Sequence, residues 1–175
     1  MKKTIVINLL GGPGTGKSTT AAAVFSELKC RGVDCELSSE FAKDLVWEQR
    51  YDTFKDQLYI FAKQAHRLFR LVGKVDVVIT DSPLILTCFY GQNDQPLCDF
   101  CIDYVSRFNN LNYFLIREKE YNPNGRNQTE AEAKQIDVGL RQTLENYNQE
   151  YKELPGNMSS VKVIADEVME LLKGD

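Results

Sequence analysis

The stretch that decides the fold is Gly11-Gly12-Pro13-Gly14-Thr15-Gly16-Lys17-Ser18, between an apolar run at 5–10 and a helix-forming run at 19–29. It matches G-x-x-x-x-G-K-[ST], the phosphate-binding P-loop, in the strand-loop-helix setting that the motif requires. Its glycines let successive backbone N–H groups point at one place. Together with the N-terminus of the next helix, these groups form a nest for phosphate oxygens. The motif therefore predicts a nucleotide-binding site.

The polar residues of the loop have separate expected roles. Lys17 reaches the β- and γ-phosphates as a point charge, and the Ser18 hydroxyl takes a coordination position on Mg²⁺. A glycine-rich turn that binds nothing would not need these two residues in register. The expected contacts to ATP are Gly12, Gly14, Thr15, Gly16, Lys17, Ser18 and Thr19.

Length and composition indicate an ordinary globular chain. The 175 residues fit a single domain over 1–175, with 43% hydrophobic and 26% charged residues. A net charge of −4 disfavours a protein that coats long nucleic acid, but it is compatible with a local basic groove. No run approaches the roughly 20 apolar residues of a membrane span, so we expect a cytoplasmic protein without a membrane partner. We expect the protein to be a monomer or a homodimer. Cys98 and Cys101 form a C-x-x-C, for which a place in the core is a better interpretation than a zinc site.

Strand and helix patterns alternate along the chain. The expected strands lie at 5–10, 33–37, 75–80, 111–116 and 161–164, and the expected helices at 19–29, 41–48, 54–72, 84–90, 97–108, 130–151 and 166–173. This alternation predicts an α/β fold with a mostly parallel sheet. Ligands of such folds bind at the carboxyl ends of the strands.

Charged residues follow the expected strands at that edge. Phosphoryl transfer requires phosphates held in line, a placed Mg²⁺ and positive groups over the migrating charge. Ser18 and Asp81 would hold the metal, and Lys17 would act with Arg117 and Arg126 on the phosphates. Glu40 would then be the base for an acceptor hydroxyl, although Asp81 is also a candidate for that role. The alternative role for Glu40 is capping of the helix that begins at Phe41.

These motifs resemble a known group of enzymes. The sequence combines G-G-P-G-T-G-K-S-T with S-E-F-A-K-D, V-V-I-T-D-S-P and an arginine-bearing polar loop before Gln135-Ile136-Asp137. In this order they resemble the P-loop kinases related to the ribosylnicotinamide kinase domain of bifunctional nicotinamide-nucleotide adenylyltransferases. The resemblance implies a three-layer α/β/α fold with a five-stranded parallel sheet, and a lid over ATP at about 117–129. It also implies that the Glu40 position contacts or deprotonates the acceptor. The nucleotidyl-transfer histidine motif of these proteins is missing from this sequence, so only the kinase half is expected to carry over.

The acceptor is less determined. The chain is also similar to small bacteriophage kinases that phosphorylate 5-hydroxymethyluracil within DNA, so a nucleoside-like molecule and a hydroxymethylated base in DNA both remain open. Gln57, Phe61 and Gln64 share a helix face and could bind and stack on a base, or they could be a polar edge beside a core phenylalanine. Basic residues are frequent in the same region: Lys43, Arg50, Lys55, Lys63, Arg67 and Arg70.

The leading hypothesis is thus a kinase that uses ATP and Mg²⁺ to phosphorylate a hydroxyl group. An ATP-driven switch protein is the alternative from another class, but it would call for a water-positioning residue and sensor arginines that the sequence does not reveal. A GTP-binding switch would call for an N-K-x-D motif, which the sequence lacks.

Overall fold

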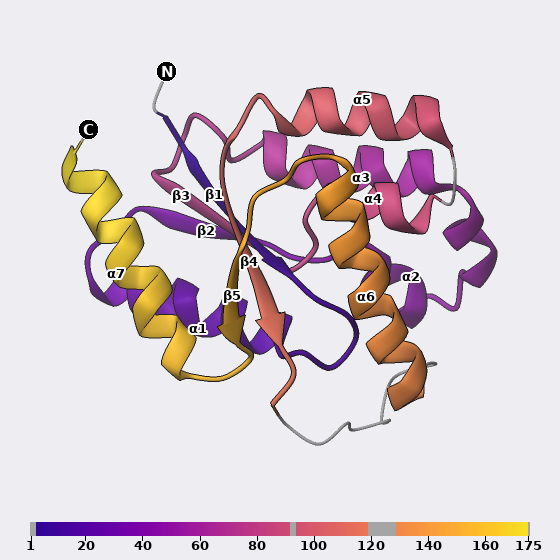
Figure 1. The fold of residues 1–175 in the computed structure, drawn as a ribbon. Coiled ribbons are helices and arrows are strands. Elements are labelled where there is room, and N and C mark those ends of the chain that lie inside the picture. Colours follow the sequence, from indigo (N-terminus) through magenta and orange to yellow (C-terminus); the bar gives the residue numbers. More distant parts are fainter. Residues whose placement is uncertain (1–2, 92–93, 119–128, 175) are drawn as a thin grey trace.

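The computed structural model describes residues 3–91, 94–118 and 129–174, and it shows one parallel sheet between two layers of helices (Figure 1). The strands are β1 (Ile5–Leu10), β2 (Cys35–Ser38), β3 (Val77–Thr80), β4 (Asn109–Ile116) and β5 (Lys152–Pro155). Their order in the sheet is β2-β3-β1-β4-β5, and every pairing is parallel. The predicted α/β class and the five-stranded parallel sheet are therefore confirmed.

The helices cover both faces of this sheet. On one face lie α1 (Lys17–Cys30) and α7 (Ser159–Gly174), and on the other lie α3 (Gln57–Phe69), α4 (Leu86–Tyr90), α5 (Gln95–Val105) and α6 (Glu130–Asn146) (Figure 1). A short helix α2 (Ala42–Trp47) and a 3₁₀ helix η1 (Tyr51–Lys55) connect β2 to α3. The predicted helix at 54–72 is thus shorter than expected, because Asp56 caps the start of α3 by accepting the Tyr59 backbone N–H.

Strand β1 lies at the centre and is buried along its whole length. Ile5, Ile7 and Leu9 pack with α1 and α7, whereas Val6 packs with the helices of the opposite face. This double coverage explains why the strand shows an unbroken apolar run instead of alternation. Because β1 pairs with both β3 and β4, the P-loop that follows it emerges at the point where the strand order reverses.

The last expected strand, at 161–164, is wrong. Val161 and Ile164 belong to α7, and the fifth strand is β5 at Lys152–Pro155. The β-branched residues suggested a strand, but Val161, Ile164, Ala165 and Val168 recur at helical spacing and are all buried. The same correction shortens the helix predicted at 130–151, since α6 ends at Asn146 and the chain then turns into β5.

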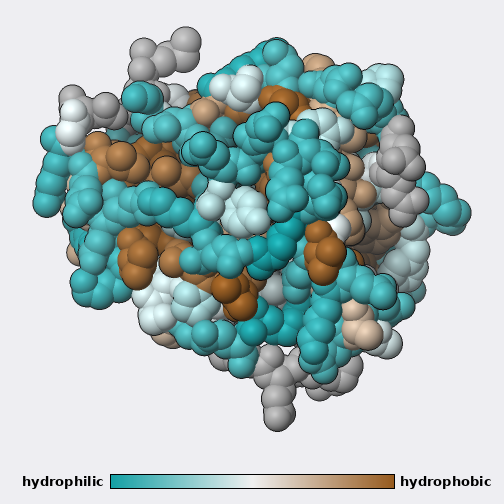
Figure 2. All heavy atoms as spheres, viewed as in Figure 1, coloured by the Kyte–Doolittle hydropathy of each residue, from teal (hydrophilic) through white to brown (hydrophobic). Residues whose placement is uncertain are grey.

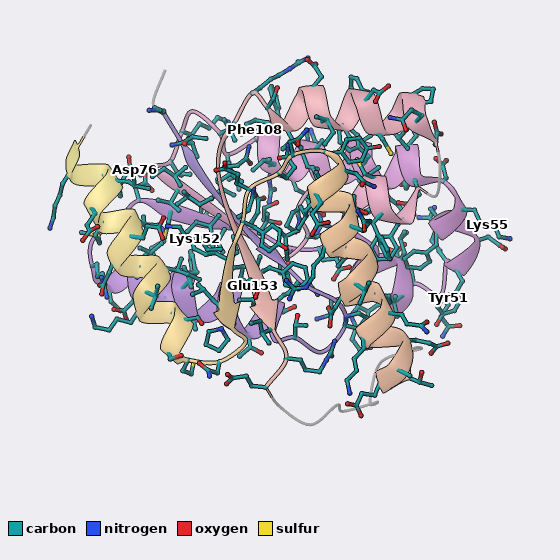
Figure 3. All side chains as sticks on the ribbon, viewed as in Figure 1. Tyr51, Lys55, Asp76, Phe108, Lys152 and Glu153 are labelled. Atoms are coloured by element: carbon teal, nitrogen blue, oxygen red, sulfur yellow. The ribbon has the colours of Figure 1, made fainter. Side chains whose placement is uncertain are left out.

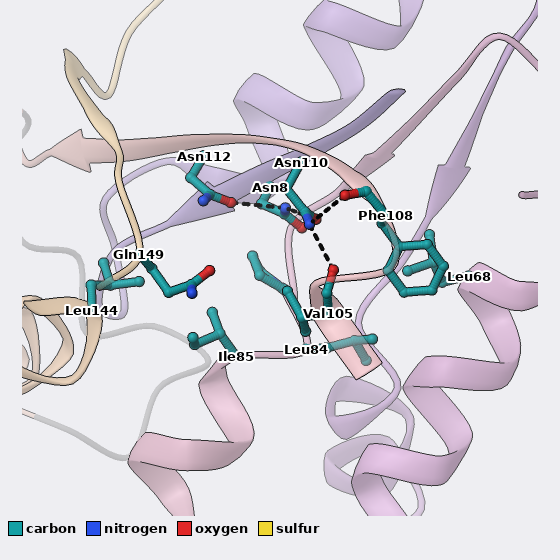
Figure 4. A pocket seen from close by; sticks show the side chains of 11 residues that line it. Asn8, Leu68, Leu84, Ile85, Val105, Phe108, Asn110, Asn112, Leu144 and Gln149 are labelled. Atoms are coloured by element: carbon teal, nitrogen blue, oxygen red, sulfur yellow. Dashed lines mark hydrogen bonds between the residues drawn. The ribbon is translucent and has the colours of Figure 1, made fainter. Parts of the chain in front are cut away.

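A polar cluster lies inside the sheet between β1 and β4 (Figure 4). Asn8 is only 6% exposed, and its amide group donates to the side-chain oxygens of Asn110 and Asn112, at 2.9 Å each. The Asn110 amide in turn donates to the backbone oxygens of Val105 and Phe108. The adjoining cavity measures about 10 Å³, close to the space of a single water. The cluster is therefore a satisfied structural element and has no room for a nucleotide.

The surface and the thiols agree with the composition. The face in Figure 2 is mainly hydrophilic, and its hydrophobic residues form separate patches. None of the described helices combines the length and the apolar character that crossing a membrane requires. Cys98 and Cys101 are buried between α4 and α5 together with Cys88, which confirms their predicted place in the core.

Gly156 provides a test of how tightly the loop after β5 packs on the P-loop. A Cβ at Gly156 would lie 2.0 Å from the Thr15 backbone oxygen, so Gly156→Ala should force the two loops apart. We expect a loss of about 1–3 kcal/mol of unfolding free energy in urea titrations. Gly174→Ala is the matched control, because nothing lies within 4 Å of the added carbon. Equal unfolding midpoints for the two variants would contradict the packing.

Candidate active site

The P-loop has the backbone shape of a phosphate nest. Gly11, Gly14 and Gly16 have φ angles of 130°, 82° and 93°, a region that residues with a side chain rarely adopt. Helix α1 begins directly after Gly16 with no side-chain cap and no acidic residue in its first turn. The N-terminus of α1 therefore keeps backbone N–H groups and a positive dipole end that an anion can satisfy.

Lys17 is folded back over this loop. Its ammonium group donates to the backbone oxygens of Gly11 and Gly12, at 2.6 and 3.0 Å. Burial lowers the pKa of Lys17, and the carboxylates of Glu40, Asp81 and Asp137 oppose that shift. The lysine thus lies among acidic groups from three different parts of the chain, and its present contacts are ones that phosphate oxygens could replace.

The other expected ATP contacts lie on the same loop and first turn. Ser18 and Thr19 are exposed at the start of α1, where a ligand can reach their hydroxyl groups. Thr15 is 2% exposed, and its hydroxyl donates to the Gly12 backbone oxygen at 3.0 Å. The Thr15 side chain therefore shapes the loop, and the predicted contact of Thr15 with ATP stays a prediction.

Asp137 ties the loop to α6. Its carboxylate accepts the Gly12 backbone N–H at 2.5 Å and pairs with Arg117 at 2.8 Å. Arg117 also donates to the Pro13 backbone oxygen. One carboxylate and one guanidinium thus hold the P-loop at Gly12 and Pro13, and Arg117, which follows β4, lies at this loop.

Sequence reasoning assigned no role to Asp137, although a signal was present. Ala133, Asp137, Leu140 and Leu144 follow helical spacing on α6, and the three apolar members are buried. A single carboxylate on an otherwise apolar stripe must have a polar partner inside the fold. That partner could not be identified before Gly12 and Arg117 were placed beside it.

Glu40 and Asp81 complete the group of charges. Glu40 follows β2, and Asp81 follows β3 and is 9% exposed. Burial raises the pKa of the Glu40 carboxyl, Lys17 opposes the rise and Asp81 adds to it. Lys17, Glu40, Asp81 and Arg117 therefore converge at the carboxyl ends of the strands, whereas Arg126 and most of the expected lid lie outside the described residues.

Gln64 holds the segment that carries Glu40. It is 5% exposed, its side-chain oxygen accepts the Phe41 N–H at 2.8 Å, and its amide group donates to the Ser39 backbone oxygen at 3.2 Å. Arg67 donates to the same Ser39 oxygen at 3.1 Å. These contacts favour a positioning role for Gln64, while the predicted contact with an acceptor stays a prediction.

Phe61 and Gln57 do not lie together on one open face. Phe61 is 3% exposed and packs edge-on against Phe100 and Tyr104, with ring centroids 5.6 Å apart in each pair. That environment favours the core interpretation for Phe61. Gln57 instead lies at the start of α3 and lines a cavity of about 430 Å³ together with Tyr90. Its contact with an acceptor also stays a prediction.

Tyr90 is a residue that sequence reasoning missed. Partial burial raises its pKa to about 12, and the charges of Glu40 and Asp137 add to the rise. The side chain is 46% exposed at the end of α4. Tyr90 thus borders the cavity and lies within electrostatic range of Glu40 and Asp137. In the sequence it is a single tyrosine in a helical stretch, a pattern that does not indicate this position.

The donors present fit a magnesium ion held mainly by nucleotide. Mg²⁺ prefers hard oxygen ligands and needs only one or two from protein when phosphates and water supply the rest. The Ser18 hydroxyl and the Asp81 carboxylate are such donors. Within residues 3–91, 94–118 and 129–174, no group of three or more acidic, histidine or cysteine side chains could hold a metal ion without further ligands.

Comparisons with known proteins agree with this architecture. A family model described as an AAA domain matches residues 6–160. Among solved structures, a mutant of the APS kinase CysC from Mycobacterium tuberculosis is similar over 99% of this chain and 99% of its own, with 16% identity and a TM-score of 0.52. No curated protein matches the chain. At this identity the structural likeness concerns the fold, which is that of a P-loop kinase.

The raised pKa of Glu40 predicts a stability gain on its neutralisation. Its folded-state pKa lies above the unfolded value, so the ionised carboxylate at neutral pH costs folding free energy. Glu40→Gln should therefore be more stable than the parent at pH 8. The difference should vanish as the pH falls through the raised pKa and below the ordinary pKa of glutamate. Urea unfolding across this range tests it, with the exposed Glu170→Gln as control. A Glu40→Gln variant less stable at pH 8 would contradict the buried-carboxylate assignment.

The Asp137 bridge predicts a large structural effect. The side chains of Arg117 and Asp137 are 9% and 19% exposed, so Asp137→Ala would remove a largely buried carboxylate from both Arg117 and the Gly12 N–H. We expect a loss of about 3 kcal/mol. Asp103→Ala removes the partner of Arg107 from a pair whose side chains are 59% and 65% exposed. That control should lose less than about 0.5 kcal/mol in the same denaturant titration. Similar losses in both variants would refute the bridge as a structural tie.

Proposed function

We propose that this chain, which belongs to the AAA domain family, is a kinase that transfers the γ-phosphoryl group of ATP to a hydroxyl of a nucleoside-like acceptor. The observation that carries the proposal is that Glu40, which follows β2, lies within electrostatic range of Lys17 of the P-loop and of Asp81, which follows β3. A phosphate nest and a lysine suffice to bind a nucleotide. A further carboxylate with a raised pKa beside them is what an acceptor hydroxyl needs to lose its proton.

Each residue of the site would have a separate role in phosphoryl transfer. The P-loop N–H groups and the first turn of α1 bind the phosphates, and the Lys17 ammonium moves from the Gly11 and Gly12 carbonyls onto them. Arg117, held by Asp137, adds positive charge at the edge of the loop. Mg²⁺, when bound with ATP, would neutralise phosphate charge, with Ser18 and Asp81 as its protein donors. Glu40 accepts the proton of the attacking hydroxyl.

The charge pattern favours a small acceptor over DNA. Three of the six lysine and arginine residues at 43–70 are paired with carboxylates: Arg50 with Glu48 at 3.3 Å, Lys55 with Asp52 at 3.0 Å, and Arg67 with Asp44. A duplex-binding surface needs unpaired cations along the phosphate backbone. Paired charges are therefore a weak basis for an extended nucleic-acid contact, although a hydroxymethylated base in DNA stays the second choice of acceptor.

ATP as donor and free cysteines are consistent with a cytoplasmic protein.

An ATP-driven switch is the second candidate, and the AAA description of the family favours it. The experiment that separates the two follows the γ-phosphate label of ATP in the presence of nucleosides, nucleotides and hydroxymethyluracil-containing oligonucleotides. A kinase places the label on one of these acceptors. Release of label only as inorganic phosphate, with every acceptor, would overturn the kinase proposal and support the switch.

The same assay chooses between the acceptors. Free nucleosides and hydroxymethyluracil oligonucleotides are compared at two salt concentrations. Each phosphate contact of a duplex substrate contributes about −0.9 to the log-log salt slope. Transfer to free nucleosides with little salt dependence supports our ordering. Transfer confined to the oligonucleotide and falling steeply with salt would reverse it.

Lys17→Ala tests the P-loop assignment. The lysine charge is most useful when charge develops on the transferred group, so we expect the rate of phosphoryl transfer to fall about a hundredfold or more while the fold is retained. Lys29→Ala is the matched control, because Lys29 lies in the last turn of the same helix, far from the P-loop. Near-normal turnover by a folded Lys17→Ala protein would contradict the assignment.

A further inference from the structure

A cavity near Glu40 and Asp137 is lined by side chains that can bind a small molecule. It measures about 430 Å³, within the range of about 300–1,000 Å³ for small-molecule sites. Phe54 and Gln57 line it from the end of η1 and the start of α3, and Tyr90 and Asp94 line it from the ends of α4 and α5 that face each other. Two aromatic side chains and an amide therefore share one opening.

Packing contacts connect this cavity to the P-loop on one side. The Phe89 ring fits against Gly139 of α6, where a Cβ would lie 2.5 Å from a ring atom. Phe89 in turn contacts the Tyr90 ring, with centroids 4.9 Å apart. Gly139 is two residues from Asp137, the carboxylate that holds Gly12. Tyr90 is thus attached to the same part of α6 as the phosphate loop.

A second set of contacts leads from Glu40 to the cavity. Phe41, the residue after Glu40, packs edge-on against Tyr59 of α3, with ring centroids 5.7 Å apart. The first turn of α3 contains both Tyr59 and the cavity residue Gln57. The cavity therefore borders α3, whose first turn contacts the residue after Glu40, and α4, whose end is connected to α6 through Phe89.

We infer that this cavity binds the ring of the acceptor, and that it selects an acceptor without a phosphate group. The inference rests on the proposed function and names the substrate class of that site: an uncharged or cationic ring compound with a free hydroxyl, such as a nucleoside. Tyr90 and Gln57 are its specificity-determining residues.

The side chains that line the cavity suit a ligand with a planar ring. Phe54 is half-buried and Tyr90 is 46% exposed, so each offers ring surface on which a planar group can pack. The Gln57 amide nitrogen donates to the Phe54 backbone oxygen at 2.8 Å. Among the described residues no hydrogen bond occupies the Gln57 side-chain oxygen or the Tyr90 hydroxyl, so these two groups can accept from and donate to a heterocycle.

The charges of the lining oppose a phosphate. Asp56 and Asp94 both line the cavity, and each uses one carboxylate oxygen to cap its helix. Among the described residues that line the cavity, Lys55 is the one cation; it pairs with Asp52 at 3.0 Å, and its side chain is 83% exposed. Figure 3 shows Lys55 pointing outward from the molecule. Within the described part of the lining, a phosphorylated acceptor would bring its charge toward two carboxylates and toward one lysine that is already paired.

Direct binding tests the inference separately from catalysis. The probes are two matched pairs: 5-hydroxymethyl-2′-deoxyuridine with its 5′-monophosphate, and nicotinamide riboside with nicotinamide mononucleotide. Dissociation constants are measured by calorimetry, with and without a non-hydrolysable ATP analogue. We expect at least one nucleoside to bind, and its monophosphate to bind about tenfold more weakly or worse.

Variants then locate the binding site. Tyr90→Ala and Gln57→Ala should each weaken nucleoside binding about three- to tenfold. Tyr51→Ala should not, because this exposed tyrosine of η1 does not line the cavity. The double variant Asp56→Asn with Asp94→Asn should bring the monophosphate within about threefold of the nucleoside, since asparagine keeps the helix caps and removes the charge. Asp103→Asn is the charge control on α5.

The outcomes separate this inference from the proposed function. Nucleoside binding that depends on Tyr90 and Gln57, without any phosphoryl transfer, would sink the kinase and leave the cavity assignment standing. Phosphoryl transfer whose acceptor affinity is indifferent to Tyr90→Ala and Gln57→Ala would overturn the cavity assignment alone. Equal or tighter binding of the monophosphates by the parent protein would overturn the claimed selectivity.

Discussion

The carboxylate of Asp137 is the contact on which the rest of the site depends. It joins the first turn of the P-loop, through Gly12, to Arg117 at the end of β4, and it does so from the middle of α6. These three segments lie far apart in the sequence. Because a partly buried carboxylate needs polar partners, these two contacts favour the observed register of α6 against the P-loop. Glycine is required at position 12 for the same reason, since a Cβ there would lie 2.6 Å from the carboxylate oxygen.

This constraint also organises the surroundings of the site. With α6 held against the P-loop, Gly139 receives the Phe89 ring and so fixes α4, which ends at Tyr90. On the other side of the site, Gln64 and Arg67 hold the backbone around Glu40. The acidic groups around Lys17 are thus placed by side chains that themselves do no chemistry. Preorganisation of this kind lets charged groups act without rearranging during a reaction.

The electrostatics of the site suit an anionic ligand. Burial of Lys17 lowers its pKa, burial of Glu40 raises its pKa, and each of these two residues opposes the shift of the other. A negatively charged ligand at the α1 N-terminus would favour the charged form of the lysine. Burial of ionisable groups that shifts their pKa values is typical of functional sites, because selection for stability alone would not favour it.

The sequence by itself determined the α/β class, the P-loop, and the strand ends that carry Glu40, Asp81 and Arg117, because these features follow from local patterns: an apolar run, a glycine motif and a polar residue after a strand. The sequence-based prediction of the last strand was wrong, because the β-branched residues at 161–164 are compatible with both a short strand and a buried helix face. Only packing against α1 and β1 decides between the two. The partners of Asp137, the bracing role of Gln64 and the place of Tyr90 beside a cavity were decided by the tertiary structure. Each depends on which side chains meet across the fold, and no local spacing records such meetings.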